Sequence, residues 1–217
     1  MNVDIKKYKQ AFLLFTIAQL LMVVSLLENG SSIKALSDLM ILFGVFHSIG
    51  FIMMVIASAK LYDKNKNYFY ALITSIICIF VSLLALIATE STEDMTVAWS
   101  RGLAVSADIL ICITYAYFFL GSREQFLEFG LERNSKRSRL GFIFVIVVTI
   151  VINLMSFIGS FQAIKTNYLA AAIFKYGRVA LKLFMYVFMF VILITMMVDM
   201  KKKFKNEKEE EAHEEKE

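Results

Sequence analysis

Four long stretches of the sequence contain no Asp, Glu, Lys or Arg: residues 11–27, 39–59, 67–89 and 140–164. They are 17, 21, 23 and 25 residues long, and a helix of about 20 apolar residues crosses the hydrocarbon core of a bilayer. A soluble domain is roughly one-quarter charged, whereas only 19% of this chain is charged. The chain is therefore predicted to be an integral membrane protein with the lipid bilayer as its surroundings.

Two further apolar stretches each contain one charged residue. Asp108 interrupts residues 102–120, and Lys182 lies within residues 179–198. Helices suit all these stretches, because backbone groups must find hydrogen-bond partners within the segment in lipid, and a barrel would show short segments of alternating hydrophobicity. The fold class expected is an all-α, polytopic membrane bundle of six transmembrane helices. The predicted spans are residues 11–27, 35–59, 68–89, 102–120, 140–161 and 179–198.

The basic residues are distributed unevenly between the two sides of these predicted spans. Seventeen of the 23 Lys and Arg residues fall in the arm 1–10, in the connections after the second and fourth spans, and in the tail 200–217. Loops rich in Lys and Arg stay in the cytoplasm, so both termini are predicted to be cytoplasmic. The richness in Lys, Asn and Ile is typical of a bacterium of low genomic GC content, which places the chain in a bacterial cytoplasmic membrane.

Several kinds of chemistry have no support in the sequence. The basic residues already have a topological explanation, which argues against nucleic-acid binding. Cys78 and Cys112 lie inside apolar runs, so buried thiols are expected rather than a disulfide framework. There is no cluster of metal ligands, no nucleotide-binding loop and no catalytic pair, so no metal and no cofactor is expected.

Asp108 is the strongest candidate for a functional residue, since an ionised side chain within a span needs a partner, a cavity or a role. Two basic residues compete as its partner. Lys182 should lie at a comparable depth in the sixth span, and Arg101 lies seven residues earlier on the same helical face as Asp108. The functional interpretation of these residues is ion or proton coupling, or capture of a polar substrate. The structural interpretation is an ion pair, or a lysine that extends its ammonium toward the membrane surface.

Three uncharged polar residues also lie within predicted spans. His47 is close to the middle of the second span, where it suits either a proton-responsive or ligand-binding role or a hydrogen bond to a neighbouring helix. Gln19 and Asn153 lie near the middles of the first and fifth spans, and such amides commonly hold helices together. A shared polar cavity would require these residues to face Asp108.

Three functional hypotheses follow from these residues. The first is a small transporter or permease-like protein with a polar site inside the bundle, taking a small polar or ionic solute. The second is a non-catalytic sensor, interaction or accessory subunit with a protein partner. The third, a membrane-embedded enzyme, is least favoured because no catalytic pair is visible. The absence of proline counts slightly against transport, because transporters often break helices at proline or glycine.

Overall fold

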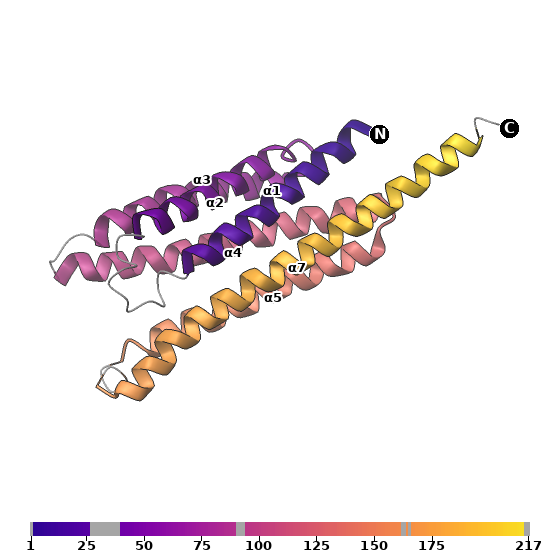
Figure 1. Cartoon of the computed structure of the whole chain (residues 1–217). Helices are drawn as coiled ribbons and strands as arrows, with labels where there is room; N and C mark the ends of the chain where they lie inside the picture. The colour runs from indigo at the N-terminus through magenta and orange to yellow at the C-terminus, as the bar shows by residue number, and fades with distance from the viewer. Residues whose placement is uncertain (1, 27–39, 90–93, 162–163, 165, 215–217) are drawn as a thin grey trace.

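The computed structural model describes residues 2–26, 40–89, 94–161, 164 and 166–214 of the 217-residue chain. These residues form six α-helices (Figure 1), which confirms the all-α fold class. The helices are α1 (Asn2–Leu26), α2 (Met40–Ala59), α3 (Lys66–Thr89), α4 (Asp94–Glu128), α5 (Glu132–Ile158) and α7 (Tyr168–Glu214). Residues 27 and 35–39, which belong to the first and second predicted spans, lie outside the described residues.

Four helices contain segments long and apolar enough to cross a membrane. These segments are Lys66–Leu84 in α3, Val105–Glu128 in α4, Glu132–Ile158 in α5 and Tyr168–Lys205 in α7. Many large apolar side chains on them point away from the bundle, including Phe80, Ile150 and Phe157, which are 64%, 55% and 64% exposed. Exposed apolar surface on this scale is typical of helices that face lipid rather than water.

The six helices form a closed bundle in which each helix packs against two neighbours. The cyclic order is α1, α2, α3, α4, α5, α7 and back to α1. Side chains of α1 also meet those of α4 across the middle of the bundle, where Phe15 stacks on Phe118 with ring centroids 3.8 Å apart. The bundle is therefore filled by side chains along α1 and α4 rather than hollow throughout.

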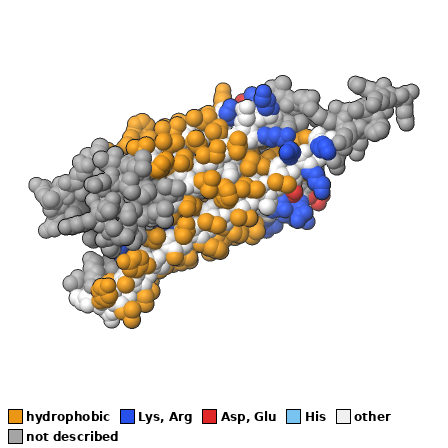
Figure 2. Space-filling view, viewed as in Figure 1, with side chains coloured by type: hydrophobic (Ala, Val, Ile, Leu, Met, Phe, Trp, Pro, Cys, Tyr) orange, Lys and Arg blue, Asp and Glu red, His pale blue; other side chains and the backbone are white. Residues whose placement is uncertain are grey.

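The two ends of the bundle differ in charge. The start of α1 and the end of α7 lie at the same end, which we call the termini end (Figure 1). On the face drawn in Figure 2, Lys and Arg side chains gather near this end, and hydrophobic side chains cover most of the remaining described surface. The opposite end, which we call the far end, is where the hairpin of α5 and α7 stands apart from the ends of α3 and α4 (Figure 1).

A short turn replaces the long basic connection expected after the fourth span. Residues 121–139 were expected to link two spans, but α4 continues to Glu128 and α5 already begins at Glu132. Gly130 turns the chain between them with a φ of 64°, a left-handed conformation that only glycine adopts without strain. The basic residues of this region therefore lie in the last turns of α4 and the first turns of α5 rather than in a connection.

Helix α7 is longer than the span predicted within it. Residues 179–198 were expected to cross the membrane, whereas the helix runs from Tyr168 to Glu214 and includes most of the charged tail. Its last turns project past the other helices at the termini end (Figure 1). Alternating Lys and Glu residues are good helix formers, so the end of the apolar segment does not end the helix.

Candidate functional site: a basic pocket at the far end of the bundle

Asp108 and Lys182 form an ion pair that joins α4 to α7. Lys182 Nζ donates a hydrogen bond to Asp108 Oδ1 over 2.7 Å. Both side chains are partly buried, with 22% of Asp108 and 27% of Lys182 exposed. Lys182, one of the two partners that the sequence offered, is therefore paired with Asp108. The side chain of Arg101, the other candidate, lies outside the described residues.

The pair lies well away from the charged residues of the termini end. Asp108 is 15 residues from Arg123 on α4, and Lys182 is 17 residues from Asp199 on α7. At about 1.5 Å per residue these separations are roughly 22–26 Å, compared with roughly 30 Å for the hydrocarbon core of a bilayer. The pair is thus several ångströms inside an apolar layer, close to its far boundary.

A pocket of about 190 Å³ opens beside this ion pair, and we call it the basic pocket. Four helices contribute to its lining: α1 at its last described residue, α4, α5 and α7. The residues are Leu26, Asp108, Ile152, Ser156, Lys175, Arg178, Val179 and Lys182. Three cations and one carboxylate therefore meet at this pocket, which gives it a net charge of +2 when all four groups are ionised.

Arg178 is held in position by two hydrogen bonds. Its Nη1 donates to Ser156 Oγ over 3.0 Å, and its Nε donates to the Phe174 carbonyl over 3.2 Å. Ser156 in turn donates to the Ile152 carbonyl within α5. A guanidinium has five N–H donors, so Arg178 retains donors for an anionic group in the pocket.

His47 lies near the ion pair but does not line the basic pocket. The charges of both Lys182 and Asp108 act on its imidazole, which places the three groups in one neighbourhood contributed by α2, α4 and α7. The His47 ring also packs edge-on against Phe51, with centroids 4.6 Å apart. His47 therefore lies within electrostatic reach of Asp108 but outside the lining of the basic pocket.

Tyr186 lies next to the Asp108–Lys182 pair on the side of the bundle middle, and we call these three residues with His47 the polar cluster. Its side chain is 3% exposed and lies within electrostatic reach of Asp108. A small gap of about 10 Å³ separates these residues from Thr149 of α5. Such a gap has room for about one water molecule among several polar groups, so it is no passage for a solute.

Gln19 is also buried inside the bundle, where both ends of its amide are hydrogen-bonded to neighbouring residues. The Tyr115 hydroxyl donates a hydrogen bond to Gln19 Oε1, and Gln19 Nε2 donates to the Phe15 carbonyl over 3.0 Å. Both Gln19 and Tyr115 are fully buried. These bonds link α1 to α4, which agrees with the expectation that this amide holds helices together.

Asn153 lies apart from the basic pocket. It lines an apolar groove of about 410 Å³ between α4 and α5, together with Cys112 and Thr149. Its Nδ2 donates to the Thr149 carbonyl over 2.9 Å, while its buried Oδ1 has no hydrogen-bond partner among the described residues. Among the described residues, Asn153 therefore lines a different pocket from the two that Asp108 lines.

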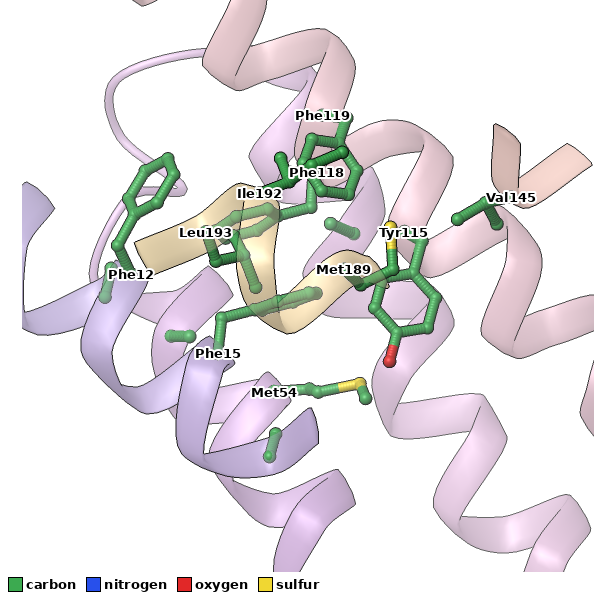
Figure 3. Close-up of a cluster of buried hydrophobic side chains, with 14 of the residues drawn as sticks. Phe12, Phe15, Met54, Tyr115, Phe118, Phe119, Val145, Met189, Ile192 and Leu193 are labelled. Atoms are coloured by element: carbon green, nitrogen blue, oxygen red, sulfur yellow. The ribbon is translucent and has the colours of Figure 1, made fainter. Parts of the chain in front are cut away.

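Aromatic side chains close the bundle between the polar cluster and the termini end. Phe12 and Phe15 of α1 meet Phe118 and Tyr115 of α4, and we call these four residues the aromatic plug. All four are fully buried. Figure 3 shows the plug packed against Met189, Ile192 and Leu193 of α7, so side chains from three helices seal this level.

A second polar layer lies on the other side of the aromatic plug. Tyr8 donates a hydrogen bond to Gln125 Oε1, and Tyr68 donates to Ser122 Oγ over 3.1 Å. Gln125 Nε2 donates to Glu128 Oε2 over 2.6 Å. Buried polar groups therefore occur both above and below the plug, with aromatic rings between them.

Sequence reasoning missed several of these residues for a common reason. Tyr8, Ser122 and Gln125 were assigned to cytoplasmic segments because charged residues flank them, yet the helices carry them into the buried core. Lys175 and Arg178 fall between the fifth and sixth predicted spans, residues 140–161 and 179–198, whereas α7 already begins at Tyr168. The sequence did contain a pattern that predicts this grouping. Lys175, Arg178 and Lys182 recur at helical spacing, so a helical projection of residues 168–182 places them on one face.

Among the described residues, no group of three His, Cys, Asp or Glu side chains is arranged to hold a metal ion. The chemistry that the pocket does offer is electrostatic, because ammonium and guanidinium groups attract and hydrogen-bond anions. Comparison of the chain with protein-family models, with curated proteins and with solved structures found no match.

Proposed function

We propose that this protein is a six-span, permease-like membrane protein that binds a small anionic solute in the basic pocket. Both termini lie in the cytoplasm in this proposal, so the far end of the bundle faces the outside. The observation that carries it is the meeting of Lys175, Arg178 and Lys182 with a single carboxylate in a pocket of about 190 Å³. Placing such charges among apolar helices is costly unless they have a role or a partner.

The six-span arrangement is supported by the helices outside the four long apolar segments. Residues 11–26 of α1 and all of α2 contain no charged side chain, and both helices complete the closed bundle. The cytoplasmic placement of the termini is supported by the Lys and Arg side chains gathered near them (Figure 2).

The permease-like part of the proposal is supported by the order of layers along the bundle. The basic pocket lies near the far end, the aromatic plug lies beneath it, and the Tyr8–Gln125 layer lies beneath the plug. Transporters bind their substrate at a site that is closed toward one side of the membrane at a time. In this proposal the aromatic plug is the closed inner gate.

Anion binding to purified protein in detergent tests the site directly. We expect methanesulfonate and inorganic phosphate to raise the unfolding temperature of the native chain. Arg178→Gln should weaken the binding of both anions by about ten- to a hundredfold, because it removes one or more charge-assisted hydrogen bonds. Lys202→Gln is the control, since Lys202 is an exposed cation at the termini end. Equal binding by both variants would refute the site.

The same anionic chemistry could come from a lipid headgroup. Nanodiscs of phosphatidylglycerol and of phosphatidylcholine separate the two sources. If the ligand is a free anion, methanesulfonate stabilises the protein equally in both lipids. If the ligand is a headgroup, phosphatidylglycerol alone stabilises the native chain, and Arg178→Gln removes that difference.

A second candidate is a non-catalytic sensor or accessory subunit, which the projection of α7 beyond the bundle favours (Figure 1). Flux measurements in proteoliposomes separate it from a permease. A permease moves the anion across the bilayer, with Arg178→Gln reducing the flux. A sensor binds the anion at the same pocket without any flux above that of protein-free vesicles.

A further inference from the structure

Attraction of an anion does not by itself explain why the carboxylate of Asp108 lies in the basic pocket. A pocket built only to attract anions would gain from three unopposed cations, yet a carboxylate lies among them and is bonded to Lys182. An anionic ligand that approaches Lys182 must therefore come close to a second negative charge. Two negative groups at one site disfavour each other's ionised form.

We infer that Asp108 takes up a proton when the anion binds, so that anion and proton occupy the basic pocket together. This inference rests on the proposed function. The proton comes from hydronium in the solvent: one O–H bond of hydronium breaks, which leaves water, and one O–H bond forms on the Asp108 carboxylate. Lys182 then turns its N–H donors from the neutral carboxyl to the anion. For a monoanionic ligand the net charge of the pocket stays at +2.

The geometry of Lys182 permits this exchange of partners. Its ammonium has three N–H donors, and one is bonded to Asp108 Oδ1 at 2.7 Å. The side chain is 27% exposed and lines the same pocket as Arg178. Because Arg178 is fixed by Ser156 and Phe174, an anion held by Arg178 and Lys182 would lie directly beside Asp108.

Among the residues that the structure describes, the other titratable groups around Asp108 offer one rival proton acceptor. The groups on the helices packed around it are Lys175, Arg178, Lys182 and Tyr186 on α7, His47 on α2, Cys78 on α3 and Tyr115 on its own helix α4. The lining from α5 adds Ser156 and Thr149, which do not titrate in this range, and the described lining from α1 is the apolar Leu26. An imidazole is the remaining group that commonly gains a proton near neutral pH, so His47 is the alternative site.

Proton uptake is measured with a pH-indicator dye when methanesulfonate is added to the purified full-length protein in weakly buffered detergent solution. Methanesulfonate is the anion of a strong acid and does not itself titrate near neutral pH. We expect about one proton taken up per anion bound by the native chain, and an affinity that falls up to about tenfold per pH unit above neutrality.

Three variants assign the proton. Asp108→Asn should bind methanesulfonate with an affinity that is independent of pH and without proton uptake. Asp108→Glu restores a titratable carboxyl and should restore uptake. His47→Gln should leave uptake unchanged. Each variant is first compared with the native chain for a single species on gel filtration, and Asp108→Glu keeps the test usable if Asp108→Asn does not fold.

The outcomes separate this inference from the proposed function. Anion binding without proton uptake by the native chain overturns the coupling and leaves the binding site in place. Loss of uptake in His47→Gln, with uptake retained in Asp108→Asn, assigns the proton to His47 instead. Absence of anion binding by the native chain removes the proposed function and the coupling with it.

Discussion

The ammonium of Lys182 lies 2.7 Å from a carboxylate oxygen of Asp108, a contact that joins two helices across 74 positions of the sequence. Each residue is the single charge within its predicted apolar span. The two residues that weaken the hydropathy of the fourth and sixth spans thus compensate each other. Their pairing lowers the cost of carrying either charge into lipid.

We expect this ion pair to contribute measurably to stability. Asp108→Asn and Lys182→Met should each lower the free energy of unfolding by about 1–3 kcal/mol, between the values for exposed and fully buried pairs. The double variant should lose less than the sum of the two, because the second substitution removes a charge that the first left unpaired. Unfolding in a mixed detergent series gives the required values.

The Lys7–Asp63 pair is the matched control for this double-mutant cycle, in which two single variants are compared with the double variant. Its charged atoms are 3.6 Å apart, and the two side chains are 43% and 44% exposed. We expect a coupling energy below about 0.5 kcal/mol from the same cycle at this pair. Equal coupling at the two sites would mean that burial does not strengthen the Asp108–Lys182 contact.

The buried hydrogen bond between Tyr115 and Gln19 gives a second prediction. Gln19→Leu leaves a fully buried hydroxyl without its acceptor, so we expect a loss of about 1–3 kcal/mol in the free energy of unfolding. Adding Tyr115→Phe should recover part of this loss, since both ends of the bond are then apolar. No recovery in the double variant would show that packing of Gln19, rather than its hydrogen bond, carries the effect.

Gly130 gives a third prediction, which tests the short turn between α4 and α5. Gly130→Ala places a side chain on a residue with a φ of 64°, so we expect a loss of about 1–2 kcal/mol. Gly130→Asn should cost less, because asparagine tolerates this conformation. Gly102→Ala is the control within a helix, where an added Cβ meets no atom within 4 Å and should be neutral or stabilising.

The orientation of the bundle gives a fourth prediction, tested by labelling cysteines on intact cells with a membrane-impermeant maleimide. The native Cys78 and Cys112 are first replaced by alanine. Ser160→Cys, at an exposed position of the far end, should react from outside, while Tyr62→Cys, in the turn between α2 and α3, should react only after the cells are opened. The reverse pattern would invert the proposed topology.

The charge-free runs located the apolar helices well, but the charged flanks hid how far the helices extend. Residues 140–161 were expected as a span, and α5 covers Glu132–Ile158. The fourth span was expected to end at residue 120, whereas α4 reaches Glu128, because hydropathy records where lipid ends and not where helical hydrogen bonding ends. Gly130 was the signal in the sequence for the turn that follows.

The candidate site was only partly accessible from the sequence. Asp108, Lys182 and His47 stood out because polar residues are rare within apolar runs. The structure pairs Asp108 with Lys182 and places His47 within electrostatic reach of both. Asn153 satisfied the same criterion, yet it faces a separate groove between α4 and α5. Depth along a helix can be counted from the sequence, whereas the direction in which a side chain faces depends on how the helix is rotated in the bundle.

The sequence by itself determined that this protein is helical and suited to a membrane, because the absence of charge over four long runs leaves no other stable surroundings. Only the tertiary structure decided that Lys182 pairs with Asp108 and that Lys175 and Arg178 share their pocket. Lipid is equally apolar on every side of a helix, so hydropathy sets no helix order and no rotation. Those are set by packing, which here places α7 between α5 and α1 and turns its cations toward α4.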